Sequence, residues 1–539
     1  MNRNGASLKR DVDFSTFLRI LLGIIFVSQV LVLLYFNLFH MKDHIGYDSS
    51  WFYLKPHLIL NEKSLFVGPW VEQTSPFLDT PLLLATLIYG LTKSIFVSYA
   101  IADFIVLISV IMCVNSILKD MNVGTTSRLF AFNLIVLPYL SNGYNVDVPD
   151  YMDVFLVGAA SYSVRVLLAL MIIKALIVIR NTGRINWIGW AAVLLCVVAG
   201  LSTGVFMVVV IIFPCLVYEL LLVFKRNDLR ILLKKESIYI YLLSAAILVG
   251  MVMSKLLGIQ VWKGPHALVP LVSLADNIFA PLLGLMKLIG VLPINDTDVQ
   301  IDSMYGLLFV FPMFIFFVIV LGLAYAVKVV RSGKDNNHIV SFFLTVIAVN
   351  YLLFSVLNFV YGSYIFEERY QITTFMIIIL LVAYYLDNAD LKQLFSKTIM
   401  IGLMISIMAY TTFSDVIYMG ITSDVSNLEG IIDLVNEEDA ELIYVWGDDL
   451  MALERPLRFY DMDHVYKSIR DEGTYYHFGD YTYYEDNEDY SGPTLLIVSN
   501  DRNVVPEDVM EQYVLIHQLG SVSMYRSDTN PIYAACEGA

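Results

Sequence analysis

Asp48 is a carboxylate in a position suited to chemistry. It follows a long apolar run and lies in an aromatic-rich segment, residues 44–53, together with Trp51. A carboxylate at a bilayer surface can accept a proton as a general base, and a neighbouring aromatic ring can contact a substrate. An ionised group beside hydrocarbon is costly to keep, so we predict a catalytic role for Asp48. The alternative is that it caps a helix that begins near Ser49.

A second acidic group lies in the segment 142–158. Asp147, Asp150 and Asp153 bring three carboxylates into one predicted loop. Such groups can bind acceptor hydroxyls or assist a general base, so Asp147 and Asp150 are candidate substrate-binding residues. A solvated acidic loop is the alternative.

Arginines supply the candidates for binding an anionic group. Arg369 lies in the run Glu368-Arg369-Tyr370 before a late apolar stretch, whereas Arg165 lies within an earlier one. The guanidinium fork matches phosphate oxygens, and an arginine inside a membrane span is a functional candidate by default. Arg369 could instead anchor a span end by snorkelling, and Arg165 could form a structural pair, with Asp103 as a conceivable partner.

Metal and nucleic-acid chemistry are weakly supported. His40, His44 and Asp48 recur every four residues, which allows a divalent metal site on one helical face. We nevertheless predict neither a metal nor another cofactor, because His40 lies at the end of a span. The sequence has no glycine-rich phosphate loop, His-Glu-x-x-His motif, nucleophile elbow or Cys-x-x-Cys pair. Its net charge of −16 argues against nucleic acid as a partner.

The composition is typical of a multi-pass membrane protein. The chain has 539 residues, of which 58% are hydrophobic and 16% charged. Apolar runs long enough to cross about 30 Å of hydrocarbon predict about eleven spans. These lie at roughly 17–39, 95–118, 128–141, 159–180, 187–201, 203–224, 237–258, 304–328, 339–361, 371–387 and 398–419. The distribution of Lys and Arg favours a cytoplasmic N-terminus, and an odd span count then places the C-terminus outside.

Three regions follow from this topology. Residues 1–16 are a predicted cytoplasmic tail, 17–419 a transmembrane module and 420–539 an extracytoplasmic domain with about 25 acidic and 6 basic residues. The first outer loop, 40–94, is the predicted catalytic loop. Within it, the apolar stretch 81–91 is short for a span and predicts a helix in the membrane interface.

The last region shows the alternating pattern of a small α/β domain. The predicted elements are a helix at 428–438, strands at 442–446 and 494–498, a helix at 506–512 and strands at 514–519 and 521–525. The segment 475–490, rich in Tyr, Asp and Glu, could contact a glycan; an exposed irregular hairpin is the alternative. We therefore predict a mainly α fold, a polytopic helical bundle with a small outward-facing α/β domain.

These segments resemble the GT-C class of membrane glycosyltransferases, which use a polyprenyl-phosphate-linked sugar as donor. The likeness is to bacterial members related to protein O-mannosyltransferases and aminoarabinose transferases. It rests on the acidic and aromatic residues 47–53 after the first span, the proline-containing segment 75–83, the Arg369-Tyr370 pair and the last strand, 522–526. Asp79 and Asp103 depart from the family pattern, because basic residues are often found near these positions.

The resemblance implies transfer of a hexose or pentose to a glycan, lipid or protein acceptor at the outer face of the cell membrane. A phosphate leaving group departs as a stabilised anion, so one base and one cation suffice. Asp48 is then the base, Arg369 contacts the donor phosphate, and Tyr370 donates a hydrogen bond; Glu368 and Arg165 join the substrate site. The alternatives are a transporter or flippase of lipid-linked saccharides and a non-enzymatic envelope protein. A transporter would usually show internal repeats, and none is evident.

Overall fold

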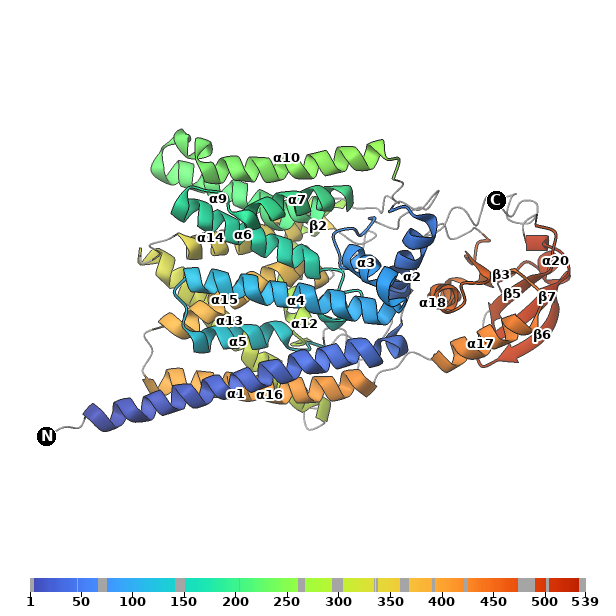
Figure 1. Ribbon diagram of the computed structural model, residues 1–539, viewed down its shortest axis with the longest axis horizontal. Helices are drawn as coiled ribbons and strands as arrows, with labels where there is room; N and C mark the ends of the chain where they lie inside the picture. Colours follow the sequence, from blue (N-terminus) through green and yellow to red (C-terminus); the bar gives the residue numbers. More distant parts are fainter. Residues whose placement is uncertain are drawn as a thin grey trace.

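Most of the chain forms a bundle of long helices, and a small sheet lies beyond one end of it (Figure 1). The architecture comes from a computed structural model. It describes residues 4–45, 47–65, 75–140, 151–202, 204–259, 267–292, 304–333, 335, 338–358, 368–389, 393–420, 425–473, 490–500 and 504–532. We call the end of the bundle that faces the sheet the sheet end, and the other the far end.

The bundle contains long helices joined by short helical turns. The long helices are α1 (Asn4–Phe39), α4 (Ile95–Asp120), α5 (Thr125–Val136), α6 (Ser163–Thr182), α7 (Trp187–Ser202), α9 (Phe213–Arg226), α10 (Lys235–Leu256), α13 (Met304–Arg331), α14 (Ile339–Val356), α15 (Ile372–Asn388) and α16 (Gln393–Gly420). The shorter elements are η1 (Met41–His44), α2 (Tyr47–Glu62), α3 (Leu82–Thr92), η2 (Met152–Leu156), α8 (Val205–Met207), η3 (Val208–Ile212), η4 (Leu229–Leu233), β1 (Ala267–Leu268), η5 (Leu271–Ser273), α11 (Leu274–Asn277), α12 (Ala280–Leu288), β2 (Leu357–Asn358) and η6 (Glu368–Gln371).

Within the described ranges, eight helical stretches are long and apolar enough to cross a membrane. The predicted spans at 128–141, 159–180 and 187–201 correspond to α5, α6 and α7, which are shorter or more polar than these eight. The predicted fold class, a polytopic helical bundle with a small α/β unit, is therefore confirmed. The count of about eleven spans remains a prediction.

The outer helices turn apolar side chains away from the bundle. On α1 the exposed residues recur at helical spacing, and they are Phe17, Ile20, Ile24, Val27 and Leu31. A helix in water shows the reverse pattern, with its polar face outward. This exposed stripe is the expected surface of a helix that contacts lipid.

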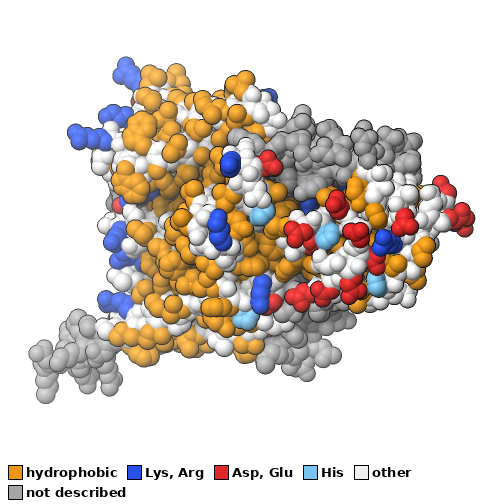
Figure 2. All heavy atoms as spheres, turned by 45° about the vertical axis from the view of Figure 1, so that its right-hand side comes forward, with side chains coloured by type: hydrophobic (Ala, Val, Ile, Leu, Met, Phe, Trp, Pro, Cys, Tyr) orange, Lys and Arg blue, Asp and Glu red, His pale blue; other side chains and the backbone are white. Residues whose placement is uncertain are grey.

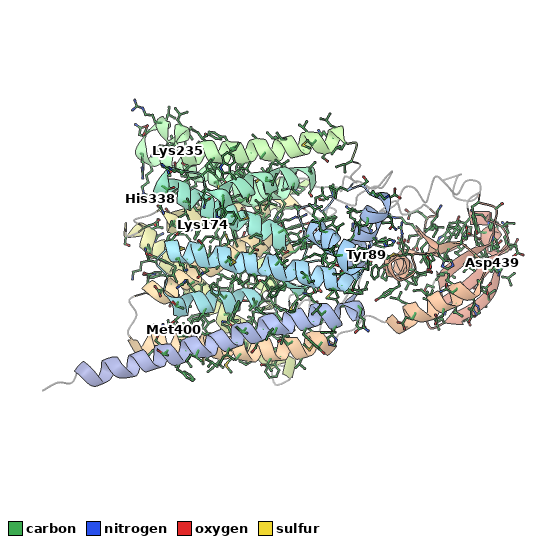
Figure 3. All side chains as sticks on the ribbon, in the orientation of Figure 1. Tyr89, Lys174, Lys235, His338, Met400 and Asp439 are labelled. Atoms are coloured by element: carbon green, nitrogen blue, oxygen red, sulfur yellow. The ribbon has the colours of Figure 1, made fainter. Side chains whose placement is uncertain are left out.

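Charge is separated along the long axis of the molecule. On the face in Figure 2, many Lys and Arg side chains lie along the edge away from the sheet and a few lie nearer to it, whereas Asp and Glu gather toward the sheet. Figure 3 places Lys235 and His338 at the far end and Asp439 on the C-terminal unit. This separation follows the pattern on which a cytoplasmic N-terminus was predicted; the orientation itself remains a prediction.

The predicted helix at 81–91 is present as α3. It begins after Pro81, which suits the first turn of a helix because proline has no N–H to satisfy. Leu87 and Leu91 are exposed, whereas Leu82 and Ala85 are buried. An apolar helix that is half exposed at the sheet end has the character expected of a helix in the membrane interface.

The C-terminal unit is a five-stranded mixed sheet with the order β4-β3-β5-β7-β6. Its elements are α17 (Val425–Glu437), β3 (Leu442–Trp446), η7 (Asp448–Leu450), α18 (Met451–Tyr460), β4 (Val465–Ile469), β5 (Thr494–Ser499), α20 (Glu507–Met510), β6 (Val514–Leu519) and β7 (Val522–Ser527). The strands β3 and β5 are central and parallel, and both faces are covered, which explains their continuous apolar sequences.

The sequence prediction found most of this unit but missed α18 and β4. Pro456 lies inside α18, where proline normally argues against a helix. Lys467 in β4 is almost fully buried, although a lysine rarely is. Both elements depend on tertiary packing, since Leu457 and Tyr466 belong to the core beneath the sheet.

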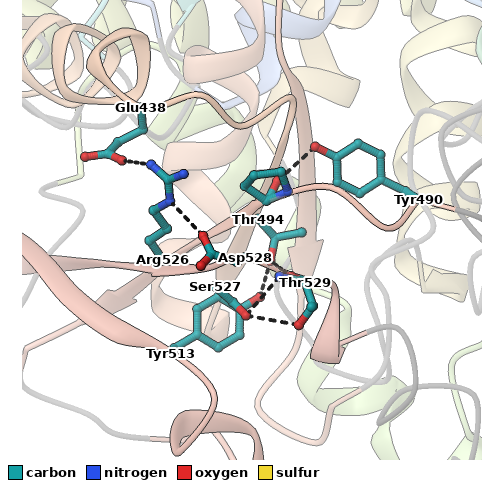
Figure 4. A network of polar contacts seen from close by, with 9 residues as sticks. Glu438, Tyr490, Thr494, Tyr513, Arg526, Ser527, Asp528 and Thr529 are labelled. Atoms are coloured by element: carbon teal, nitrogen blue, oxygen red, sulfur yellow. Dashed lines mark hydrogen bonds and ion pairs between the residues drawn. The ribbon is translucent and has the colours of Figure 1, made fainter.

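A polar network fixes the end of the sheet (Figure 4). Arg526 of β7 forms an ion pair with Glu438, with an Nη1–Oε2 distance of 2.5 Å. The Oγ1 atom of Thr494 donates to the carbonyl oxygen of Thr529 at 2.8 Å and lies 2.7 Å from the hydroxyl of Tyr513. These contacts join β5 and β7 to the residues that directly follow α17, precede β6 and follow β7.

Two helices of the bundle touch through glycine, and this close contact can be tested. A Cβ atom on Gly200 of α7 would lie 2.2 Å from the carbonyl oxygen of Ile247 in α10. Gly200→Ala must therefore push these helices apart, and we expect a loss of about 1–3 kcal/mol of stability. The control is Gly23→Ala, because nothing lies within 4 Å of that position. Equal thermal unfolding temperatures of both variants in detergent would contradict the close packing.

Candidate functional site

Helix α2 carries Asp48 at the sheet end of the bundle. The helix begins at Tyr47, so Asp48 lies in its first turn, where a negative charge interacts favourably with the helix dipole. The side chain of Asp48 lies outside the described part of the chain. One turn later, Trp51 is only 3% exposed, so this substrate-binding candidate is a buried residue.

Lys55 anchors helix α2 to the proline-containing segment, residues 75–83. Lys55 is 1% exposed, and its Nζ atom donates to the carbonyl oxygen of Pro76 at 2.7 Å. A buried ammonium group requires such partners because desolvation is costly. Lys55 was overlooked in the sequence, although a lysine inside an apolar stretch indicates a buried and paired charge. The contact sets the distance between the helix of Asp48 and the segment that begins at Ser75.

Arg165 forms a buried ion pair with Asp79, not with Asp103. The Nε atom lies 2.8 Å from Oδ2 of Asp79 and the Nη2 atom 3.0 Å from Oδ1, a bidentate geometry. Both residues are buried: Arg165 is 7% exposed and Asp79 is 4% exposed. The predicted partner, Asp103, lies instead beside Tyr53 and Tyr99.

Asp79 is held from a second side as well. Its backbone N–H donates to the Oγ atom of Ser202 at the end of α7, at 3.2 Å. Within the same segment, Phe77 has a φ of 56°, a left-handed conformation that costs energy for a residue with a side chain. The hydroxyl of Thr80 donates to the carbonyl oxygen of Phe77 at 2.7 Å and stabilises this turn. Residues 75–81 are therefore fixed against α2, α6 and α7.

Three aromatic rings surround the guanidinium of Arg165. Its Cζ atom lies 5.0 Å from the ring centre of Tyr162, 5.6 Å from Phe206 and 5.9 Å from Phe77. Such cation–π contacts are strongest away from water. The rings of Tyr162 and Phe206 also contact Tyr370, with centroid distances of 6.3 and 6.5 Å. The structure thus brings together Arg165 and Tyr370, two residues far apart in sequence.

The run from Glu368 to Tyr370 lies in η6, directly before α15 as predicted. Glu368 is buried and forms an ion pair with Lys287 of α12, with an Nζ–Oε2 distance of 3.2 Å. Gln371 donates to the carbonyl oxygen of Pro281 at 3.2 Å. The guanidinium of Arg369 is half-buried and lies 6.0 Å from the ring of Tyr370. Helix α12 therefore holds this candidate anion-binding segment in place.

Asp147 and Asp150 lie outside the described residues, whereas Asp153 is described in η2. The Tyr418 hydroxyl, at the end of α16, donates a short hydrogen bond to Asp153. His44 stacks on Tyr418 with a centroid distance of 4.8 Å. These two contacts join η1 and the end of α16 to η2, and they were not predicted.

Burial changes the acid–base behaviour of His44. Desolvation lowers the pKa of His44 from 6.5 to about 4, and the charge of nearby His40 contributes in the same direction. The imidazole is therefore neutral in the folded protein at neutral pH. No three His, Cys, Asp or Glu side chains gather to form a metal site in the described part of the chain. The hypothesis of a metal site formed by His40, His44 and Asp48 stays untested, because the side chain of Asp48 lies outside the described part of the chain.

Removing one partner of the Arg165–Asp79 pair should be strongly destabilising. Asp79→Ala leaves a buried guanidinium without its carboxylate, and we expect a loss of about 3–5 kcal/mol. The double variant Asp79→Leu with Arg165→Met should recover much of this loss. As a control, Glu472→Ala breaks an exposed pair with Arg470 and should cost about 0–1 kcal/mol. Thermal unfolding in detergent measures all three; equal losses for Asp79→Ala and Glu472→Ala would contradict the buried pair.

The neutral state of His44 predicts a pH dependence of stability. Between pH 6.5 and about 4 the unfolded chain binds a proton at this residue and the folded chain does not. Stability should therefore fall as the pH decreases through this window, by at most roughly 3 kcal/mol from this group. His44→Phe keeps the stacking and cannot titrate, so its unfolding temperature should depend less on pH. An unchanged pH dependence in His44→Phe would show that other groups cause it.

No family model matches the sequence, and no curated protein matches it either. Solved structures do match. ArnT from Cupriavidus metallidurans in the apo state is 9% identical over 95% of this chain and 98% of that chain, with a TM-score of 0.59. ArnT bound to undecaprenyl phosphate is 11% identical over 94% and 97%, with a TM-score of 0.56. The mycobacterial arabinofuranosyltransferase AftD is 11% identical over 95% of this chain and 40% of that chain, with a TM-score of 0.44. From the helical bundle to the C-terminal sheet, the chain has the fold of ArnT.

Proposed function

We propose that this protein is a membrane glycosyltransferase that moves a sugar from a polyprenyl-phosphate donor to an acceptor hydroxyl. The observation that carries the proposal is the ArnT-like fold, which covers 95% of the chain. ArnT has been solved with undecaprenyl phosphate bound, and a lipid phosphate is the carrier that a membrane-embedded transferase requires. The acceptor belongs to the classes of glycan, lipid or protein. Resident metal or cofactor chemistry forms no part of the proposal.

In the proposed reaction, the bond between the sugar anomeric carbon and the phosphate oxygen breaks. The acceptor oxygen forms the new bond to that carbon, and Asp48 takes the acceptor proton. The polyprenyl phosphate leaves as a stabilised anion, so the reaction needs no strong acid. The first turn of α2 supports this role, because it carries Asp48 at the sheet end.

Arg369 is the proposed cation for the donor phosphate. Arg165 is less suited to that role than the sequence suggested, because its fork already binds Asp79 at two points. Its proposed role is to hold Tyr162 and Phe206 against Tyr370, which neighbours Arg369. Glu368 contributes through Lys287, which fixes η6 to α12. Asp147 and Asp150 remain proposed acceptor contacts.

The proposed location of the reaction is outside the cytoplasm, at the sheet end. The basic far end supports this orientation, since positive charges are retained on the cytoplasmic side. Nucleotide sugars are not found outside the cytoplasm, so a sugar donor there must arrive on a lipid. This chemistry fits the proposed contact between Arg369 and the donor phosphate.

The test supplies the purified protein with a panel of polyprenyl-phosphate sugars and acceptors. We expect transfer by the wild type, and a decrease in kcat of about 100- to 10,000-fold in Asp48→Asn, because the general base is lost. The matched control is Asp43→Asn, another carboxylate of the same loop, which should retain wild-type activity. Transfer at the wild-type rate by Asp48→Asn would refute the role of the base. Failure of the wild type with every donor would refute the function.

A further inference from the structure

Helix α18 of the C-terminal unit packs with one face against the sheet and with another face against the bundle. Leu453 and Leu457 pack in the core beneath the sheet. Arg455 and Phe459, four residues apart and thus on one helical face, point to the bundle. Phe459 is 6% exposed and belongs to the apolar core of the bundle, not to that of the sheet.

This second face lies on α2 (Figure 1). The guanidinium of Arg455 lies 5.2 Å from the ring centre of Trp51, and Arg455 is only 4% exposed. The ring of Phe459 contacts Tyr53 at 5.8 Å and Phe96 of α4 at 6.0 Å. An arginine over an indole ring away from water makes a favourable cation–π contact.

The same helix also holds the chain on the other side of Asp48. The hydroxyl of Tyr460 donates to the carbonyl oxygen of Lys42 in η1 at 2.6 Å. Lys42 precedes Asp48, and Trp51 and Tyr53 follow it. Helix α18 therefore contacts the chain before and after the first turn of α2. Because Asp48 belongs to that turn, the position of its backbone depends on α18.

We propose that α18 positions the first turn of α2, and that Arg455 is a positioning residue for the reaction of Asp48. The inference rests on the proposed function for its catalytic part, whereas the structural coupling between Arg455 and α2 stands independently. The C-terminal unit thereby helps to position the active site. Arg455 acts on Asp48 through its contact with Trp51, and the substrates need not touch Arg455.

The experiment compares Arg455→Met with Arg455→Lys and with the control Arg526→Met. Arg526→Met removes the ion pair with Glu438 in the same unit and leaves α18 and α2 intact (Figure 4). Hydrogen–deuterium exchange of the peptide 47–55 reports on the first turn of α2. We expect roughly tenfold faster exchange in Arg455→Met and wild-type exchange in Arg526→Met.

Activity supplies the second measurement. Misplacement of a base by about 1 Å lowers the rate strongly, so kcat of Arg455→Met should fall about 10- to 100-fold, with the donor KM within about threefold. Arg455→Lys keeps the charge but lacks the planar guanidinium, and it should recover only part of kcat. A general folding defect would instead lower the unfolding temperature and the active fraction, without faster exchange confined to 47–55.

Two results would overturn the inference. One is unchanged exchange at 47–55 in Arg455→Met, which would refute the coupling between α18 and α2. The other is faster exchange with wild-type kcat, which would refute the role of Arg455 in the reaction. If the wild type transfers no sugar from any donor, the proposed function fails, and the exchange measurement alone decides whether α18 positions α2. The two failures are therefore distinguishable.

Discussion

The bidentate ion pair between Arg165 and Asp79 connects the segments from which the candidate site is built. Arg165 belongs to the buried helix α6, and Asp79 to the segment between α2 and α3. The rings that enclose the guanidinium reach Tyr370 in η6. Two charges buried without each other would be too costly to keep. The pair therefore requires the proline-containing segment to lie against α6, and the surrounding rings extend this contact to η6.

Helix α6 shows how this bundle tolerates charge. Lys174 pairs with Asp120 at 2.6 Å, and Arg180 lies 3.7 Å from Glu219. Together with Arg165, each of these cations has a carboxylate from a different segment of the chain. A buried charge with a fixed partner specifies which segments must be neighbours, whereas apolar packing alone would permit other arrangements. The described charges of α6 thus act as constraints on the arrangement of the helices.

The sheet end combines two differently built parts. The strands β3 and β5 form a core of their own with α17 and α18, yet Phe459 extends into the core of the bundle. One short helix therefore serves both the sheet and α2. This arrangement explains why α18 tolerates Pro456 and buries Arg455: its conformation is determined by contacts on two sides.

Much of the fold was predictable because the hydrophobic patterns that indicate helices and strands are local in the sequence. The long apolar runs gave the helices, and the strands 442–446 and 514–519 were predicted at their observed bounds. The run Glu368-Arg369-Tyr370 was correctly placed before α15. Asp103 was considered as a conceivable partner of Arg165, whereas the partner in the structure is Asp79, since pairing across the bundle leaves no periodic pattern in the sequence. Lys55 and Arg455 were overlooked for the same reason, and His44 was considered only as a possible metal ligand.

The sequence by itself determined that this chain is a membrane bundle with an acidic α/β unit, because hydrophobicity and charge act on each segment independently of the others. It also supplied the candidates for the proposed site, a carboxylate after the first span and an arginine before a late one. Only the tertiary structure decided which groups meet: Asp79 with Arg165, Lys55 with Pro76, and Arg455 with Trp51. The physical reason is that the energy of a buried charge depends on its few nearest partners, and these come from segments that are distant in the chain.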